Sequence, residues 1–299
     1  MSLQRQLVML AVLASSVSSR KRQSPIAFWD NDVMVNVSLP MISFINYDRR
    51  LEGVKIENNG HTIKIGIPED KQPKIRGGLL PEDYRLVQIH FHWGAINALG
   101  SEHKFGDDHF PFEMHLVHVR GMKTLNDALR DPRGLAVLGI FYELSNELDN
   151  TLTPISNALE KIQFKNNEVE LSSFNLWSLL PRDTSNFFTY YGSLTTPPCS
   201  EVVIWTLFTE THAISADQLR QFRNVFVHSE ESLVAGETDI EDKLLFNHRP
   251  TQPINNRAVY ARRHKVGLVR KCYSTANAPL PNLLLLLTLL SPLISAAFS

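Results

Sequence analysis

The sequence predicts a mainly β (α+β) protein, a single domain built on one large sheet with short helices at its periphery. Strand-like alternation of apolar and polar residues dominates the chain of 299 residues, and 43% of these residues are hydrophobic, enough for a sizeable core. Signals for long helices are few. No internal repeat, Gly/Ser linker or charge block divides the central part of the chain into two units.

The strand predicted at residues 84–93 has the clearest alternation. One face carries Leu86, Gln88, His90 and His92, and the other carries Val87, Ile89, Phe91 and Trp93. Further strands are predicted at residues 112–119, 135–144 and 202–208, and the turn signal Asn58-Asn59-Gly60 leads into a strand at 61–67.

Two short helices are predicted from their first residues. Ser215 and Gln218 have the spacing of a capping box that begins a helix at 216–226. Pro154 stands where a first helical turn can begin before 155–162. Both helices are short, so we expect them on the surface of the sheet.

Charge and cysteine content exclude several classes of function. Lys and Arg total 30 against 31 Asp and Glu, so no basic excess exists to bind a nucleic acid, and no nucleic-acid partner is expected. Two cysteines exclude a disulfide-stapled scaffold and a four-cysteine zinc site. A bound metal must therefore be held mostly by other side chains.

The two ends of the chain have the composition of processing signals. Arg5 is followed by an apolar run at 7–14 and then by mostly small residues, which predicts a secretory signal peptide at 1–19. Residues 274–299 are rich in leucine and uncharged, typical of a glycosylphosphatidylinositol (GPI) attachment signal. The domain at 20–273 is thus expected at the extracellular face of the plasma membrane on a lipid anchor, or otherwise secreted.

Histidines supply the candidate metal ligands. His90 and His92 are separated by one residue on a predicted strand, so both imidazoles project from the same face. His115 lies on another strand with Glu113 two residues before it, and Gln88 precedes His90 in the same way. A metal-bound imidazole usually donates its second N–H to such a neighbour. The His-x-His pair alone is weak evidence, because two solvated histidines on an exposed strand give the same pattern more often.

A series of motifs runs in order through most of the chain. They are Gln23-Ser24-Pro25-Ile26, Asn58-Asn59-Gly60-His61, Gln88-Ile89-His90-Phe91-His92-Trp93-Gly94, Ser101-Glu102-His103, Glu113-Met114-His115-Leu116-Val117-His118, Gly192-Ser193-Leu194-Thr195-Thr196-Pro197-Pro198, Asn247-His248-Arg249-Pro250 and Gln252-Pro253. With them the chain resembles the α-class carbonic anhydrases, in particular the extracellular GPI-anchored members.

The resemblance implies a twisted, mostly antiparallel sheet of about ten strands and a zinc ion held in a conical cleft by His90, His92 and His115. It also implies the activity, reversible hydration of carbon dioxide to bicarbonate and a proton. Three neutral imidazoles suit this reaction because they leave the full charge of Zn²⁺ on the ion. The ion lowers the pKa of a bound water to about 7, a value for which carbonic anhydrase itself is the reference case.

Further roles follow from the resemblance. It implies that Thr195 accepts a hydrogen bond from the zinc hydroxide and donates one to Glu102, and that Thr196 helps to place bicarbonate. From the residues alone, a turn threonine before the two prolines is the favoured interpretation of Thr195. The residues expected to support the site through hydrogen bonds are Gln88, Glu113, Asn247, His103 and Tyr190.

Carbon dioxide is apolar and needs an apolar wall beside the ion. Val203 and Trp205 share one strand face, and Val117 shares a face with His115. By resemblance, Val137 and Leu194 complete the wall. A packed core would give the same pattern.

His61 is the candidate proton shuttle, since an imidazole titrates near neutral pH and can relay a proton to buffer. Its place after Asn-Asn-Gly matches the shuttle of the family, although an exposed turn histidine looks identical. Lys64 stands three residues later, where the family more often has an amide. If Lys64 faces the cleft, its charge disfavours protonated His61.

The chain departs from the family pattern at its start. In extracellular relatives a segment of some tens of residues precedes the Gln-Ser-Pro-Ile motif, so the domain is expected to be shortened and to expose apolar surface. Cys199 stands where secreted members carry a cysteine bonded to that segment. Pairing with Cys272 and two free thiols both stay open.

Two other functions stay open as well. A binding or adhesion module on the same fold would not need catalysis, but this chain keeps all three histidines. A zinc hydrolase acting on small activated esters would use the same ion. The expected protein is a monomer whose partners are carbon dioxide and bicarbonate.

Overall fold

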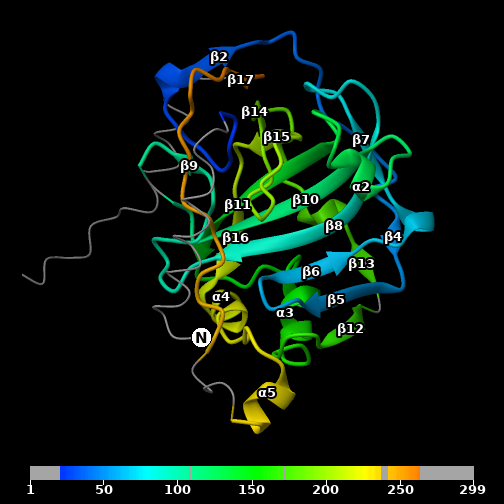
Figure 1. Cartoon of the computed structure of the whole chain (residues 1–299), viewed down its shortest axis with the longest axis vertical. Coiled ribbons are helices and arrows are strands. Elements are labelled where there is room, and N and C mark those ends of the chain that lie inside the picture. The colour runs from blue at the N-terminus through cyan, green and yellow to red at the C-terminus, as the bar shows by residue number, and fades with distance from the viewer. Residues whose placement is uncertain (1–20, 108, 172, 237–241, 263–299) are drawn as a thin grey trace, which may run out of the picture.

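A large sheet runs through the computed structural model, which describes residues 21–107, 109–171, 173–236 and 242–262 (Figure 1). Within these residues the sheet has 13 strands. Its main path is, in order, β12 (Glu168–Leu171), β5 (Val54–Asn58), β6 (Ile63–Gly66), β8 (Tyr84–Trp93), β10 (Phe112–Arg120), β11 (Leu135–Ser145), β15 (Val203–Phe208), β14 (Phe187–Gly192), β17 (Val259–Ala261) and β2 (Val33–Val35).

The remaining strands attach to this path or pair with each other. On the large sheet, β16 (His212–Ser215) pairs with β11, β7 (Lys74–Arg76) with β8, and β3 (Ser43–Ile45) with β7. Two small sheets join β1 (Ala27–Phe28) to β9 (Lys104–Phe105) and β4 (Arg50–Leu51) to β13 (Phe174–Asn175).

The prediction of a mainly β fold with a mostly antiparallel sheet is confirmed, and the sheet has more strands than the roughly ten that the resemblance implies. Most neighbours are antiparallel, whereas β11 is parallel to β15 and β16, and β17 is parallel to β2. Parallel neighbours cannot be joined by a tight turn. Long excursions of the chain therefore separate β11 from β15.

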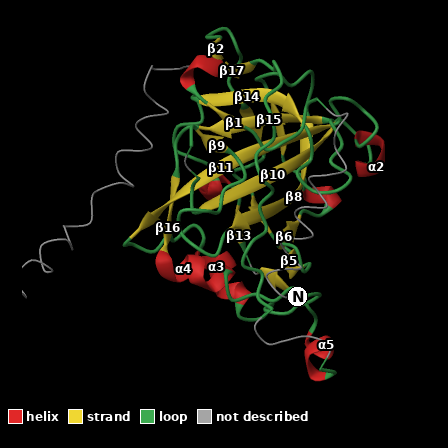
Figure 2. Ribbon diagram, turned by 60° about the vertical axis from the view of Figure 1, so that its left-hand side comes forward, coloured by secondary structure: helices red, strands yellow, loops and turns green. Residues whose placement is uncertain are grey.

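Short helices lie outside the sheet, as predicted (Figure 2). They are α2 (Leu125–Ala128), α3 (Thr153–Leu159), α4 (Ala216–Phe222) and α5 (Glu230–Val234), with 3₁₀ turns η1 (Asp30–Asp32), η2 (Glu69–Lys71) and η3 (Trp177–Leu179). The Ser215–Gln218 capping box begins α4 as expected. This helix ends at Phe222 rather than at residue 226, because the chain turns so that Phe226 donates its N–H to the Gln163 carbonyl.

The sheet separates two apolar clusters. The large cluster covers one face and includes Ile56, Ile89, Phe91 and Leu116. The small cluster lies on the other face and consists of residues from several strands and from the loops beside them. Its members include Ile26, Phe28, Val117, Val119, Val137, Phe141, Tyr190, Val203 and Trp205.

A β-bulge in β8 corrects the predicted alternation. Val117 of β10 opposes Gln88, but His118 opposes Leu86, so Val87 is an extra residue in β8. Leu86 consequently packs in the large cluster rather than on the face of His90, and Val87 packs against the small cluster. The faces predicted for these two residues were wrong, because the alternation assumed an uninterrupted strand.

Candidate metal centre

The structure brings the three predicted histidines together. His90 on β8 directly opposes His115 on β10, and His92 opposes Glu113. Directly opposed residues project from the same face of a sheet, which here is the face of the small cluster. One ring nitrogen from each of His90, His92 and His115 lies within 4.8 Å of the other two.

Hydrogen bonds behind the rings direct two nitrogen lone pairs toward the same space. His92 donates its Nδ1–H to the carbonyl oxygen of Asn247 at 2.8 Å, and His115 donates its Nε2–H to the Glu113 carboxylate at 2.7 Å. These bonds leave lone pairs on Nε2 of His92 and Nδ1 of His115. Nδ1 of His115 is 3.2 Å from Nε2 of His90.

The arrangement fits a divalent cation. Nε2 of His92 is buried and has no hydrogen-bond partner among the described residues, an uncommon state for a polar atom in a folded protein. Nitrogen donors that converge in this way are the preferred ligands of Zn²⁺ in sites that keep a fourth position open. A second cluster, His103, Glu113 and His115, is less suited because its members already bond to one another.

Burial favours the neutral imidazoles of His90 and His92. Desolvation is the main cause of a His90 pKa well below the ordinary histidine value, and the neighbouring His92 and His115 lower it further. Desolvation also lowers the pKa of His92 to about 4, against an opposing effect of the Glu102 carboxylate. Neutral imidazoles are the form that binds a metal at pH 7.

Glu113 is a buried carboxylate with four donors. Its Oε1 accepts from His115 and from Nδ1 of His103 at 2.8 Å, and its Oε2 accepts the backbone N–H groups of Glu102 and His103 at 2.7 and 2.9 Å. Burial alone raises the pKa of Glu113, but His103 and His115 outweigh it and hold the pKa well below its usual value. The carboxylate is therefore ionised and anchors His115.

The network continues away from the metal centre. His103 Nε2 accepts a hydrogen bond from the Tyr190 hydroxyl at 2.7 Å, and that hydroxyl lies 2.8 Å from Ser24 Oγ. Desolvation raises the pKa of Tyr190, so the phenol keeps its proton. His103 thus links Tyr190 to Glu113, the carboxylate that binds the His115 ring, and the supporting roles of both residues stay predictions.

Two expected hydrogen bonds are not formed in the described part of the chain. Nδ1 of His90 has no partner, so Gln88 does not hold this ring. Oε2 of Glu102 also has no partner, and it lies 3.5 Å from Nε2 of His92 rather than on the Thr195 hydroxyl. Its Oε1 accepts the backbone N–H of Arg249 at 2.9 Å.

The two threonines differ in accessibility. Thr195 is buried, and Thr196 is exposed. Thr196 uses its carbonyl to accept the backbone N–H of Cys199 at 2.9 Å. The predicted roles of both side chains stay predictions.

The predicted apolar wall is assembled. Val117, Val137, Val203 and Trp205 belong to the small cluster, and Leu194 packs against it. The Trp205 ring lies 4.8 Å from the His115 ring, centroid to centroid. The wall therefore adjoins the metal ligands.

His61 and Lys64 belong to the hairpin next to the centre. His61 is exposed, and Asn247 Nδ2 donates to its carbonyl oxygen at 3.2 Å. Asn247 thereby links the backbone of His61 to the His92 ring. Lys64 directly opposes His90 across the β6–β8 pair, so it shares the face of the metal ligands, and it forms an ion pair with Glu57.

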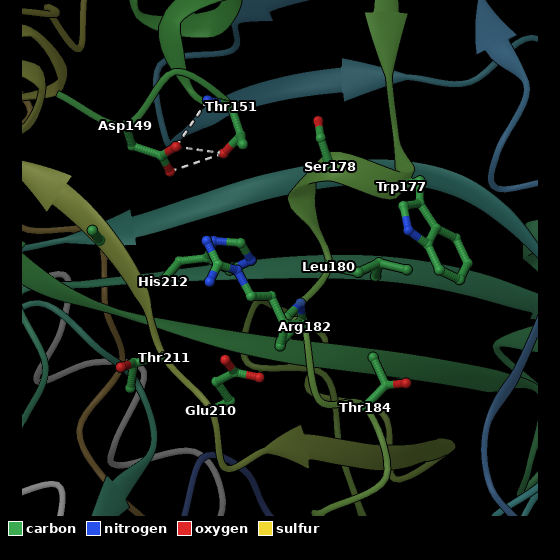
Figure 3. A pocket seen from close by; sticks show the side chains of 12 residues that line it. Asp149, Thr151, Trp177, Ser178, Leu180, Arg182, Thr184, Glu210, Thr211 and His212 are labelled. Atoms are coloured by element: carbon green, nitrogen blue, oxygen red, sulfur yellow. Dashed lines mark hydrogen bonds between the residues drawn. The ribbon is translucent and has the colours of Figure 1, made fainter.

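A separate cavity of about 580 Å³ contains none of the predicted site residues (Figure 3). His212 lines it and stacks on Tyr142, a member of the large cluster. Asp149, which bonds to Thr151, and Trp177 lie at other points of its wall (Figure 3). This cavity is thus on the opposite face of the sheet from the metal centre.

Sequence reasoning missed several residues that shape the site. Gly139 opposes His115 and leaves room for Glu113 and Leu207. Arg249 binds Glu102 through its backbone and Gln23 through its side chain. The sequence does contain a signal for Glu57: a strand before the Asn-Asn-Gly turn would place this residue opposite Lys64 in a hairpin. Cys272 lies outside the described residues, so a disulfide with Cys199 and two free thiols both stay open.

Comparison with known proteins agrees with this geometry. The family model described as "Eukaryotic-type carbonic anhydrase" matches residues 13–263. A Caenorhabditis elegans protein named "Putative carbonic anhydrase 5" is 42% identical over 261 residues, which are 86% of this chain and 80% of that protein. Carbonic anhydrase 7 of Mus musculus is 36% identical over 248 residues, 82% of this chain and 90% of its own. Carbonic anhydrase 4 of Rattus norvegicus is 34% identical over 270 residues, which are 89% of this chain and 81% of that protein. The chain therefore belongs to the family of eukaryotic-type carbonic anhydrases.

Proposed function

We propose that this carbonic anhydrase catalyses the reversible hydration of carbon dioxide with a zinc ion held by His90, His92 and His115. The convergence of three histidine ring nitrogens within 4.8 Å of one another carries the proposal. Zinc in such a site supplies hydroxide at neutral pH by lowering the pKa of a bound water to about 7, as established for this family. Glu113 and the Asn247 carbonyl keep the His115 and His92 rings in the metal-binding tautomer.

The chain's own residues divide the remaining tasks. Val117, Val137, Val203, Leu194 and Trp205 form an apolar wall that accommodates an uncharged, apolar substrate. Thr195 orients the attacking oxygen through a hydrogen bond to Glu102. In the structure Oε2 of Glu102 lacks a partner, so it has an acceptor available for the Thr195 hydroxyl. Thr196, exposed beside it, contacts bicarbonate.

Metal analysis and stopped-flow kinetics of the purified protein test the proposal. We expect stoichiometric zinc, carbon dioxide hydration and inhibition by a sulfonamide. His92→Ala should lose both zinc and activity. His212→Ala is the matched control, because this histidine lies on the opposite face of the sheet, and it should keep both.

The rival functions give different results in the same assays. Zinc-replete protein that hydrates no carbon dioxide but cleaves small activated esters would support a hydrolase. Protein without zinc or either activity would support a binding module. Either result would overturn the proposal.

We also propose export and attachment to the extracellular membrane face by a GPI anchor, with residues 1–19 and 274–299 as the two signals. These segments lie outside the described residues, and no helix in the described part is long and apolar enough to cross a membrane. Expression in animal cells followed by phosphatidylinositol-specific phospholipase C tests the anchor. Release of activity from intact cells is expected, and activity that stays in the membrane after treatment would contradict it.

A further inference from the structure

A row of directly opposed residues crosses the sheet and ends at the metal ligands. Glu168 on β12 opposes Glu57 on β5, Glu57 opposes Lys64 on β6, and Lys64 opposes His90 on β8. His90 in turn opposes His115. Since opposed residues share a face, this row carries its charged side chains on the same side of the sheet as the metal centre.

Residues on the other face of the β5–β6 hairpin support this orientation of Glu57 and Lys64. Ile56, Ile63 and Ile65 are fully buried in the large cluster, and strand alternation then directs Glu57 and Lys64 away from that cluster. The side chains of Lys64 and Glu57 are 35% and 31% exposed. Both side chains are therefore partly accessible to solvent.

The charges of the row are paired in a specific way. Glu168 forms an ion pair with Lys55, whereas Glu57 forms one with Lys64. Lys64 is the cationic member of the row and stands one strand from His90, and its partner Glu57 stands one strand further away. The ion pair thus draws the ammonium group toward β5 and away from the metal ligands.

We propose that the Lys64–Glu57 pair sets the affinity of the metal centre for anions, including the product bicarbonate. Lys64 attracts the anion, and Glu57 is a positioning residue that restrains the ammonium and offsets its charge. Carbon dioxide carries no charge, so the pair acts on the product and on anionic inhibitors rather than on the substrate. This inference rests on the proposed function, because it requires a metal at the three histidines.

Thiocyanate binding to the Co²⁺-substituted protein, followed by visible absorption at low ionic strength, tests the inference directly. Lys64→Gln should weaken thiocyanate binding by about three- to tenfold, and Glu57→Gln should strengthen it by a similar factor because the ammonium is released. The double variant should return close to the wild-type affinity. If Glu57 only supported the fold, Glu57→Gln would not strengthen thiocyanate binding.

Lys55→Gln is the matched control. It removes the same charge from the same face, but Lys55 opposes Gly66 rather than a member of the row, and its ion-pair partner Glu168 is the member of the row farthest from His90. Its thiocyanate affinity should equal that of the wild type. The differences among the other variants should shrink in 0.5 M of a weakly coordinating salt, since exposed charges are then screened.

Steady-state kinetics separate the two proposals. In an active wild type, Lys64→Gln should raise KM for bicarbonate and leave KM for carbon dioxide unchanged. Equal thiocyanate affinities for Lys64→Gln, Glu57→Gln and the wild type would refute the role of the pair, while zinc binding and activity of the wild type stand. A wild type without metal or activity would refute the proposed function itself.

Discussion

Glu113 and His115 stand two positions apart on the same face of β10, and the Glu113 carboxylate accepts the His115 Nε2–H at 2.7 Å. The same carboxylate binds the His103 ring and two backbone N–H groups. One buried anion therefore fixes the tautomer of His115, a candidate metal ligand, and binds the loop before β10 through two backbone N–H groups. The orientation of the His115 ring therefore depends on a residue outside the candidate triad of His90, His92 and His115.

Glu113→Gln should weaken zinc binding by about 10- to 100-fold, because an amide no longer favours the His115 N–H by its charge and its NH2 group leaves two of the four buried donors without an acceptor. Competition with a chelator measures the change. Gln88→Ala is the control, since the structure has no hydrogen bond from Gln88 to His90. Equal zinc affinities for Glu113→Gln and the wild type would contradict the anchoring role.

Gly139→Ala should destabilise the protein by about 1–3 kcal/mol. A Cβ there would lie 2.6 Å from Leu207 Cδ2 and 3.3 Å from Glu113 Oε1, so it must displace the packing behind His115. Gly66→Ala, on β6 with nothing within 4 Å of the added Cβ, should be neutral or slightly stabilising. Urea unfolding of the two variants gives the comparison, and equal losses would show that the position opposite His115 is not special.

The buried pair His118–Tyr47 predicts an acid-sensitive fold. Desolvation lowers the pKa of His118 to about 3, against 6.5 for a free histidine. The unfolded chain therefore binds this proton first, and stability is lost as the pH falls from about 6.5, by up to about 1.4 kcal/mol per unit.

The free energy of unfolding, measured from pH 7.5 to pH 5, tests this pair. His90 and His92 contribute in the same direction, so the informative quantity is the difference between the wild type and His118→Asn. The variant should be less stable at pH 7.5 but show a flatter pH dependence. A parallel pair of curves would rule out His118 as a source of acid sensitivity.

His61→Ala should reduce the rate of carbon dioxide hydration about 10- to 100-fold in dilute buffer, because the proton released at the centre loses its exposed relay. Added imidazole buffer should restore much of the rate, and zinc content should stay unchanged. His109→Ala offers a comparison at a half-buried histidine that bonds to the Ser101 carbonyl. A full rate for His61→Ala in dilute buffer would assign the relay elsewhere.

The sequence could predict the strands that carry the ligands because β8, β10, β11 and β15 have long alternating or apolar runs. Their observed bounds differ by at most one residue at either end from the prediction. The bulge at Val87 could not be predicted, since Val is an ordinary strand residue and the register shift arises from pairing with β10. Likewise, the mixed order of the sheet depends on contacts between strands far apart in sequence.

The site was predictable to the extent that it depends on residue type and spacing. His90, His92 and His115 meet because two strands pair in one register. The Asn247 carbonyl that holds His92 is a backbone atom, which no side-chain pattern signals. The sequence marks Lys64 as an unusual charge at its position. That Lys64 forms an ion pair with Glu57 is seen only once the two residues are paired across β5 and β6.

The extra residue in β8 lets one strand serve two purposes. Before the bulge, the even-numbered residues Tyr84 and Leu86 pack in the large cluster. After it, the odd-numbered residues Ile89, Phe91 and Trp93 pack there instead. This change of parity places His90 and His92 on the face of the small cluster. Without Val87, the two halves of the strand could not both keep their present faces. Either His90 and His92 or Tyr84 and Leu86 would have to move to the opposite face of the sheet.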